Sequence, residues 1–273
     1  MNHTKIEWAL NPDGTPGYTW NPITGCLNGC DYCYARRLAN TRLKKVYLAN
    51  LRVSTKTSVL SEYADALADP FYPRFWPDRL YQKDSPRLWE TKQKAKGIFV
   101  CDMSDLFGIG IPEKWTKEIL DYIKRCPNDR FYLLTKQPQN LAKFSPFPDN
   151  CWVGVTATND SMFRIASIEL MKVNAKVKYI SFEPLLDWSD YYAGVLTRVN
   201  SLGDRWMKQG GINWLIIGAQ SKPYKPPKIE WVKEIIMAAE RAGIPYFIKN
   251  NLKPLLEKEQ SFKGWAMKQE MPK

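Results

Sequence analysis

The sequence predicts an α/β fold, a partial or irregular TIM-like (β/α) barrel with about six to seven parallel strands. From residue 97 onward, short apolar runs are each followed by a polar cluster and then by a stretch with helical periodicity, which is the pattern of repeated βα units. The length of 273 residues is ordinary for a single barrel of this type. Polar residues recur where the predicted strands end, and in such barrels the chemistry lies at that edge.

The N-terminal part is expected to supply the first strand and the first helix. Residues 5–25 are predicted to form an entry strand and a loop, with Pro22 favouring an extended residue before it. Residues on one face at helical spacing then predict the first barrel helix, which has a basic outer side: Ala35, Leu38, Ala39, Arg42 and Val46. Residues 50–96 show no repeat of strand and helix, and we interpret them as an insertion rich in aromatic and basic residues.

The remaining elements follow in regular order. The predicted strands are 97–101, 131–134, 152–155, 178–182, 214–218 and 246–248, and the predicted helices are 113–125, 161–173 and 229–242. The pattern indicates one barrel domain over residues 1–250, with the insertion at about 50–96, and a C-terminal extension over residues 251–273. This extension is either a closing helix or a contact to a partner.

The charge favours a polyanionic partner. The formal net charge is +12 at pH 7, which points first to nucleic acid. No acidic residue occurs between Asp31 and Glu62, whereas several Arg and Lys residues do. A solvated helix face is the alternative for this basic run, but its start three residues after Cys33 favours a functional role. No apolar run approaches the roughly 20 residues that span a bilayer, and the N-terminus lacks the apolar core of a signal peptide. We therefore expect a cytoplasmic protein with reduced thiols and no membrane partner.

Three cysteines lie close together in the predicted entry loop. Cys26, Cys30 and Cys33 have the spacing C-x3-C-x2-C, and Gly25 and Gly29 allow tight bends. Three thiolates from one loop suit an inorganic ion or cluster better than a disulfide. A structural zinc ion takes four protein ligands, whereas a four-iron cluster with three thiolates keeps one iron open. A zinc loop completed by a distant Cys or His remains the alternative.

The other candidate ligands are expected to do different work. The only histidine, His3, lies near the start of the chain, and a fraying terminus is a poor source of a ligand. Cys101, Cys126 and Cys151 lie within or beside apolar runs, and we expect them to be buried structural thiols.

With Tyr32 before the third cysteine, the loop resembles the motif of the radical S-adenosylmethionine (SAM) superfamily, C-x3-C-x-aromatic-C. The resemblance implies a [4Fe-4S] cluster held by Cys26, Cys30 and Cys33, with SAM on the fourth iron. Most of the chain also resembles the phage-associated three-Cys family of radical-SAM-like proteins, in blocks spread from about residue 4 to residue 250, such as 103–107, 152–156, 181–186 and 214–218. This resemblance implies a host-cytoplasmic location if the protein is phage-encoded, and a reductant such as a flavodoxin or ferredoxin.

Superfamily analogy implies roles for residues at the strand ends. Ser104 and Asp105 are expected near the amino group of SAM, and Thr156 near its ribose hydroxyls or carboxylate. Ile216 is expected to pack on adenine, and Glu183 is the expected catalytic carboxylate, facing ribose or substrate. Gln220 stands where the family pattern has Glu, in Ala219-Gln220-Ser221, so it would bind only as a neutral hydrogen-bonding group.

The implied function is a radical SAM enzyme that modifies bases or reverses lesions in nucleic acid. The cluster would cleave SAM reductively, and the resulting radical would abstract hydrogen from the substrate. The residues expected to contact nucleic acid are Arg36, Arg37, Arg42, Lys44, Lys45, Arg74, Trp76, Arg87 and Lys136. For the aromatic stretch, packing at one end of the barrel is the alternative. Two other functions stay open: the same chemistry on a peptide or small metabolite, and a zinc-stapled nucleic-acid-binding module without enzymatic activity.

Overall fold

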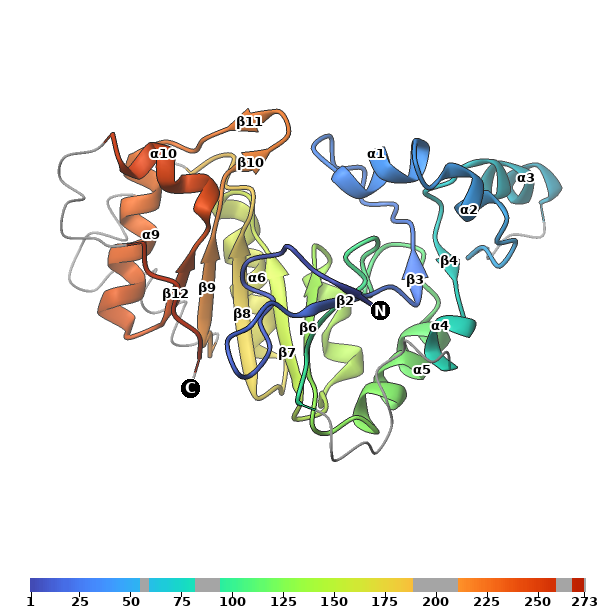
Figure 1. The fold of residues 1–273 in the computed structure, drawn as a ribbon, viewed down its shortest axis with the longest axis horizontal. Helices are drawn as coiled ribbons and strands as arrows, with labels where there is room; N and C mark the ends of the chain where they lie inside the picture. The colour runs from blue at the N-terminus through green and yellow to red at the C-terminus, as the bar shows by residue number, and fades with distance from the viewer. Residues whose placement is uncertain (55–58, 82–93, 189–210, 259–266, 273) are drawn as a thin grey trace. The chain divides into compact units, whose positions relative to one another are not determined.

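The structure is a computed structural model that describes residues 1–54, 59–81, 94–188, 211–258 and 267–272. The chain divides into two compact units, one of Met1–Asn140 with Phe147–Cys151 and one of Leu141–Pro146 with Trp152–Lys273. Each unit carries parallel strands covered by helices (Figure 1). No helix in the described ranges is long and apolar enough to cross a membrane.

In the first unit, the strands lie in the order β1-β2-β5-β6. Strand β1 (Asn2–His3) is antiparallel to β2 (Tyr18–Trp20), while β5 (Gly97–Val100) is parallel to both β2 and β6 (Arg130–Thr135). Helix α5 (Glu113–Lys124) packs on these strands, because Trp20 contacts both Tyr122 of α5 and Phe131 of β6. The predicted entry strand and two following strands are thus confirmed.

A second layer of the first unit carries the cysteine loop. Its elements are β3 (Ile23–Thr24), α1 (Tyr34–Asn40), α2 (Lys44–Leu48), α3 (Leu60–Ala68), β4 (Arg74–Phe75), α4 (Asp78–Tyr81) and the 3₁₀ helix η1 (Pro138–Asn140). Strands β3 and β4 pair antiparallel, which brings the start of the cysteine loop beside the aromatic stretch around residue 74. Of the predicted insertion, the structure describes residues 50–54, 59–81 and 94–96.

The predicted first helix is interrupted. Helix α1 ends at Asn40 and α2 begins at Lys44, because Thr41 leaves the helical region with φ −118° and ψ −99°. The side chains of Asn40 and Thr41 donate hydrogen bonds back to the carbonyls of Arg36 and Arg37, both at 2.8 Å. Such bonds compete with helix continuation, and they explain why apolar spacing alone overestimated the length of this helix.

In the second unit, β7 (Cys151–Thr156), β8 (Val177–Phe182), β9 (Trp214–Ile217) and β12 (Tyr246–Ile248) form parallel ladders in that order. With β2, β5 and β6 of the first unit, these make seven strands in parallel ladders, within the expected range. The other elements are α6 (Asp160–Met171), α9 (Ile229–Ala242), α10 (Lys253–Leu256), the hairpin β10 (Gln220–Ser221) and β11 (Tyr224–Lys225), and the 3₁₀ helices η2 (Ala142–Phe144) and η3 (Asn250–Leu252).

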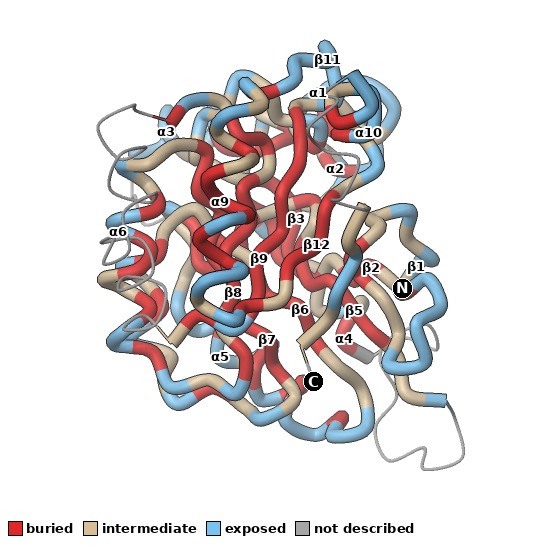
Figure 2. Tube along the Cα trace, turned by 90° about the vertical axis from the view of Figure 1, so that its left-hand side faces the viewer, coloured by how far each residue is buried: buried red, intermediate tan, exposed pale blue. Residues whose placement is uncertain are grey.

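Aromatic residues build the core of the second unit. Phe182 packs against Phe163 of α6 and against Trp188, whose indole N–H donates to Glu234 of α9 at 2.9 Å. Figure 2 shows the strands buried along most of their length, while the helices alternate between buried and exposed turns. Helix α9 ends where expected, because Gly243 follows it with a left-handed φ of 68°.

Part of the predicted C-terminal extension pairs with a strand. The Ile248 N–H donates to the Lys268 carbonyl at 2.8 Å, and Phe247 and Gln269 form an antiparallel bridge. The indole N–H of Trp214 donates to the Glu270 carbonyl at 2.8 Å. The segment 267–272 therefore belongs to the edge of the second unit, beside β12.

Candidate cluster and cofactor site

The cysteine loop begins directly after β3 and bends at two glycines. Gly25 and Gly29 have φ values of 86° and 69°, which only glycine adopts at little cost. A Cβ atom on Gly25 would lie 2.3 Å from the Tyr72 carbonyl oxygen, so the loop also requires glycine for close approach. The Gly25 N–H donates to the Met103 carbonyl at 2.9 Å. The loop is thereby held against the segment that follows β5.

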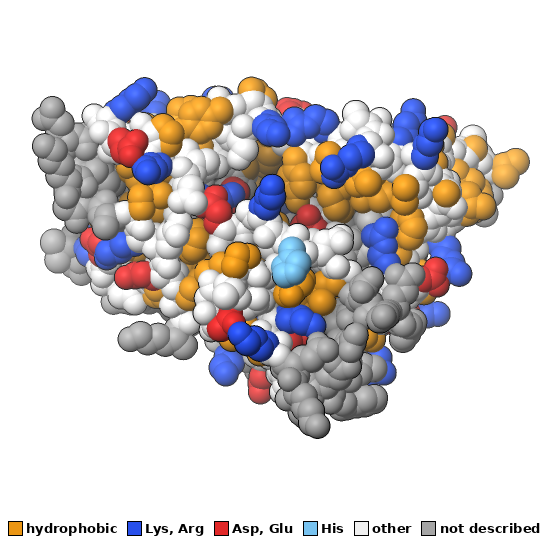
Figure 3. Space-filling model, viewed as in Figure 1, with side chains coloured by type: hydrophobic (Ala, Val, Ile, Leu, Met, Phe, Trp, Pro, Cys, Tyr) orange, Lys and Arg blue, Asp and Glu red, His pale blue; other side chains and the backbone are white. Residues whose placement is uncertain are grey.

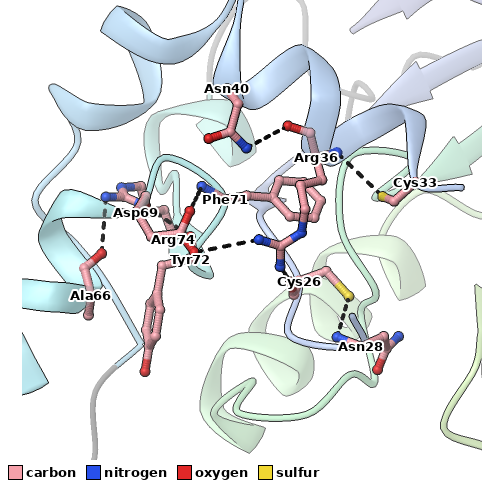
Figure 4. Close-up of polar contacts among 10 residues, drawn as sticks. All are labelled: Cys26, Asn28, Cys33, Arg36, Asn40, Ala66, Asp69, Phe71, Tyr72 and Arg74. Carbon is pink, nitrogen blue, oxygen red and sulfur yellow. Dashed lines mark hydrogen bonds and ion pairs between the residues drawn. The ribbon is translucent and has the colours of Figure 1, made fainter. Parts of the chain in front are cut away.

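The three cysteines have partly buried thiols that form no disulfide. Cys33 caps the N-terminus of α1 by accepting the Arg36 N–H at 3.3 Å, and the Cys26 sulfur accepts the Asn28 N–H at 3.4 Å (Figure 4). Within the described ranges, no three His, Cys, Asp or Glu side chains lie close enough together to hold a metal ion. In this conformation the three sulfurs are therefore not gathered into a ligand set.

The donor chemistry still fits an iron–sulfur cluster. Backbone N–H groups directed at two sulfurs favour thiolates, as in known clusters. Burial is the main cause that raises the pKa of the Cys26 thiol, to about 12, so that a bound cation would be needed to hold it as a thiolate. Soft thiolate ligands that come from one loop with two glycine bends are typical of iron–sulfur cluster sites.

No fourth ligand for zinc is evident. All six cysteines and the single histidine lie within the described residues. Cys101, Cys126 and Cys151 are buried as predicted, and burial raises the pKa of each thiol. His3 is exposed and stacks on Tyr18, with ring centroids 4.3 Å apart. The zinc alternative stays a prediction, which metal and sulfide analysis distinguishes from the cluster.

Asp105 organises the loop from the other side. It is 5% exposed, and its Oδ2 accepts both the Asn28 side-chain amide and the Lys136 N–H at 2.9 Å. Its Oδ1 accepts the Phe107 N–H at 3.1 Å, and Gln137 donates to the Asn28 side-chain oxygen at 2.8 Å. One buried carboxylate therefore joins the cysteine loop to the segments that follow β5 and β6.

Ser104 and Asp105 both make contacts within the protein. The Ser104 hydroxyl donates to the Gly25 carbonyl at 2.5 Å, and both carboxylate oxygens of Asp105 accept hydrogen bonds. These side chains support the loop, and their contacts with the amino group of SAM stay a prediction.

Tyr32 lies beside a positive charge. The Lys136 ammonium is 5.8 Å from the centroid of the Tyr32 ring, which places Lys136, predicted to contact nucleic acid, beside the cysteine loop. The next tyrosine, Tyr34, donates to the Asp102 carbonyl at 2.7 Å, and Asn21 donates to the Asp102 carboxylate at 2.6 Å. The sequence interpretation missed Asn21, Asn28 and Gln137. Of these three, Asn28 could have been found, because it lies between Cys26 and Cys30 in the sequence.

Five of the eight basic residues predicted to contact nucleic acid lie on α1, on α2 or in the turn between them. Arg37, Arg42, Lys44 and Lys45 are exposed, and Figure 3 shows Lys and Arg side chains over these helices at the upper right. Arg36 instead donates to the Cys26 carbonyl at 3.2 Å and lies 5.0 Å from the centroid of the Phe71 ring. Arg36 therefore supports the cysteine loop as well.

The prediction for Arg74 is wrong. Its side chain is fully buried (0% exposed), and its guanidinium donates to five backbone carbonyls, those of Asn50, Ala66, Leu67, Asp69 and Tyr72. Figure 4 shows the guanidinium among the backbone at the end of α3. No donor of this side chain is left for a phosphate, so Arg74 stabilises the fold of the insertion.

The aromatic stretch is largely packed. Trp76 is partly buried, its indole donates to Thr24 at 2.8 Å, and the Arg79 guanidinium lies 4.0 Å from its ring centroid. It packs against a cluster of buried residues that includes Ala35, Tyr47 and Phe71. This packing favours the structural alternative for Trp76 over base stacking. Arg87 lies outside the described residues.

The second unit places further predicted residues on one face of its strands. Thr156 on β7 is in register with Ser181 on β8, and Ser181 is in register with Ile216 on β9. Because paired residues of neighbouring parallel strands share a face, these three form one row. The Ser181 hydroxyl is buried and has no hydrogen-bond partner in the described part of the chain. Ile216 is 0% exposed, so it offers no open surface on which adenine could pack.

Glu183 follows β8 and pairs with a cation. It forms an ion pair with Lys249, which follows β12, and the two side chains are 24% and 12% exposed. A Cβ atom on Gly218 would lie 2.9 Å from Lys249 Cδ and 3.4 Å from Glu183 Cγ, so the glycine makes room for the pair. Gln220 is partly buried and donates to the Pro223 carbonyl at 3.0 Å. The sequence interpretation named Glu183 but missed Lys249 as its partner.

Comparisons with known proteins support the fold. A model of the family described as "Protein of unknown function (DUF5131)" matches residues 3–263. No curated protein matches the chain.

Two similar solved structures are of spore photoproduct lyase. One is complexed with dinucleoside spore photoproduct, with 12% identity, a TM-score of 0.51, and coverage of 83% of this chain and 74% of that chain. The other is a cysteine-to-serine variant, with 12% identity, a TM-score of 0.53, and coverage of 91% and 78%. Both are radical SAM enzymes with TIM-like barrels, and the likeness confirms the predicted α/β fold class.

Proposed function

The chain belongs to the family described as "Protein of unknown function (DUF5131)", and from this premise we propose that it is a radical SAM enzyme that acts on nucleic acid. It would bind a [4Fe-4S] cluster through Cys26, Cys30 and Cys33, with SAM on the open iron. A small reducing protein such as a flavodoxin or ferredoxin would supply the electron. When bound, the reduced cluster and SAM supply a carbon-centred radical that abstracts hydrogen from the substrate.

The cysteine loop is the single observation that carries the proposal. Its three thiols, its two glycines at positive φ and the amides directed at Cys26 and Cys33 occur in a chain with the fold of radical SAM enzymes. Three protein thiolates leave one iron of a four-iron cluster open. A fourth protein ligand would close that position.

The side chains around the loop would hold it in place during the reaction. Arg36 binds the Cys26 carbonyl, and Asp105 binds Asn28. These contacts hold the Cys26 carbonyl and the Asn28 side chain, so they would restrain this part of the loop when the cluster binds. Tyr32 and Lys136 form the side of the loop where a positive charge would favour an anionic group.

The strand ends of the second unit would bind the polar parts of a ligand. Glu183 with Lys249 supplies a partly exposed carboxylate and ammonium group, and this charged pair suits either a ribose or a polar substrate group. The Thr156 and Ser181 hydroxyls of the same strands are 2% and 1% exposed, so they would meet a ribose only after a local rearrangement. Gln220 would act only as a neutral hydrogen-bonding group.

Nucleic acid is the substrate class that the charge favours. The net charge is +12, and helices α1 and α2 with the turn between them expose Arg37, Arg42, Lys44 and Lys45. One structural neighbour is complexed with a dinucleoside photoproduct. We therefore propose a reaction on a nucleobase, as base modification or lesion reversal. A base within a duplex would have to be flipped out, at a cost of a few kcal/mol.

Anaerobic reconstitution with iron and sulfide tests the proposal. We expect methionine and 5′-deoxyadenosine by mass spectrometry after reduction in the presence of SAM, with extra product when an oligonucleotide substrate is present. Cys30→Ser should abolish cleavage, whereas Cys126→Ser, a buried cysteine outside the loop, should retain it. Intact SAM in the fully reconstituted and reduced protein would reject the enzyme. Cleavage that never depends on DNA or RNA would reject the substrate class alone.

A further inference from the structure

The second unit carries an exposed arm that the sequence interpretation did not assign. It consists of the β10–β11 hairpin and the residues that follow to Lys228, and it projects from the end of β9 (Figure 1). Gln220 pairs with Lys225, and Ser221 pairs with Tyr224. Residues 221–226 are all exposed. Such a small two-stranded ribbon has no core of its own, so another element must hold it.

Asn251, just after β12, holds the arm. Its side chain donates to the Ala219 carbonyl at 2.8 Å and accepts the Ala219 N–H at 3.1 Å. It also donates to the Ser221 hydroxyl at 3.3 Å, and its own carbonyl accepts the Tyr224 hydroxyl at 3.1 Å. One residue therefore fixes both strands of the arm beside the strand ends that carry Glu183 and Lys249.

The arm is strongly basic. Lys222, Lys225 and Lys228 are exposed, and no acidic residue occurs from Ala219 to Ile229. Within the described residues, none of these three lysines forms an ion pair with a carboxylate. Figure 3 shows Lys or Arg side chains above this part of the second unit. Three cations on one exposed segment can contact more than one phosphate of a strand.

The arm also presents an aromatic ring in a fixed position. Tyr224 is 48% exposed although its hydroxyl is bound to Asn251. A ring held at one end and open on its surface is a platform on which a base can stack without much ordering cost. Base faces are open to such a ring only where the bases are unpaired.

We propose that this arm binds a single-stranded stretch of nucleic acid, with the three lysines on its phosphates and Tyr224 stacked on a base. The inference rests on the proposed function and extends it, because it names unpaired strands as the ligand and the arm as the element that holds them. Its place beside Glu183 and Lys249 would bring a displaced nucleotide to the strand ends of the second unit.

Oligonucleotide binding at several salt concentrations tests the inference. The probe is a labelled single-stranded DNA of mixed sequence, compared with its duplex and with an abasic strand of equal length. The test variant is Lys222→Gln/Lys225→Gln/Lys228→Gln. Its matched control is Lys143→Gln/Lys172→Gln/Lys176→Gln, which removes the same charge from exposed lysines on η2, after α6 and before β8. Circular dichroism of each variant checks that it is folded before binding is measured.

We expect the arm variant to lower the log–log salt slope for the single strand by about 2, since each phosphate contact contributes roughly 0.7. The control should leave the slope near that of the wild type. Tyr224→Leu should weaken binding of the single strand roughly 5- to 150-fold, without weakening binding of the abasic strand, whereas Tyr224→Phe should bind close to the wild type.

Two failures are distinguishable. If the wild-type protein binds no DNA or RNA, the nucleic-acid part of the proposed function fails together with this inference. If the wild type binds but the arm variant and the control lose equal affinity, or if the abasic strand and the duplex respond to Tyr224→Leu as the single strand does, only the inference about the arm is overturned.

Discussion

Asn28, inside the cysteine loop, donates its side-chain amide to Oδ2 of Asp105 at 2.9 Å, although the two residues are 77 positions apart. The same oxygen accepts the Lys136 N–H, so three segments of the first unit meet at one carboxylate. Because Asp105 is buried, these charge-assisted bonds are protected from competing water. The position of the cysteine loop thus depends on a residue that is not itself a cysteine.

Replacing Asp105 should loosen the loop. Asp105→Asn keeps the shape but turns one oxygen into an N–H donor, which would face an N–H group from Asn28, Lys136 or Phe107. We expect the free energy of unfolding to fall by about 1–3 kcal/mol in urea titrations. Iron incorporation on reconstitution should fall as well.

Asp121→Asn is the matched control for this change. Asp121 is exposed on α5, so its replacement should alter stability by less than about 0.5 kcal/mol. Equal stability and equal iron content in the two variants would show that the Asp105 contacts do not organise the loop.

Arg74 should behave as a structural residue. Arg74→Lys would leave most of the five carbonyls it binds without a donor, so we expect a loss of at least about 3 kcal/mol in the free energy of unfolding. Arg42→Gln, at an exposed position of the same unit, should leave stability unchanged and lower the salt slope of DNA binding by about 1. A stable Arg74→Lys protein with weakened DNA binding would restore Arg74 to the interface.

The ion pair of Glu183 and Lys249 should show measurable coupling. A double-mutant cycle with Glu183→Gln and Lys249→Met would isolate the pairwise term, since both side chains are mostly buried. We expect a coupling energy of roughly 0.5–3 kcal/mol in unfolding experiments. The double variant should lose less stability than the sum of the losses of the two single variants. Additive single and double variants would mean that the pair contributes nothing to the folded state.

Asp102 should make stability depend on pH. Burial raises the pKa of its carboxyl, although hydrogen bonds from Asn21 and Tyr34 oppose the shift. The folded state therefore holds this proton more tightly than the unfolded state, whose pKa is about 3.9. Stability from this group is full below that value and is lost as the pH rises through the raised folded-state pKa.

The variant Asp102→Asn should remove that loss. From a pH of about 4 upward, the free energy of unfolding of the variant relative to the wild type should rise, by no more than about 1.4 kcal/mol per pH unit. Urea titrations across this range measure the difference. A difference that stays flat or falls with rising pH would contradict the burial of an ionisable Asp102.

The sequence predicted most strands and helices because their signals are local. Helix α9 has an apolar face and is followed by Gly243, and β9 is an uninterrupted apolar run. The break at Thr41 was missed, because side chains that bond to the preceding turn leave the apolar spacing unchanged. Apolar periodicity reports which face is buried and says little about where a helix stops.

The candidate site could be predicted where it depends on the spacing of residues along the chain. It could not be predicted where it depends on contacts between segments that are far apart in the sequence. Cys26, Cys30 and Cys33 are recognisable from eight consecutive residues. Arg74 was wrongly predicted to contact nucleic acid. An arginine among aromatic residues gives the same sequence pattern whether its side chain is exposed or buried against backbone carbonyls. Asp105 and Lys249 gain their partners only through the folding of separate strands.

Electron paramagnetic resonance of the reduced, reconstituted protein before and after addition of SAM, with metal and sulfide analysis of the same sample, tests the central claim most directly. We predict about four irons and four sulfides per chain, a cluster signal that shifts when SAM binds to the open iron, and loss of the signal in Cys26→Ser, Cys30→Ser and Cys33→Ser. Zinc without sulfide, or a cluster signal that SAM does not change, would contradict the account.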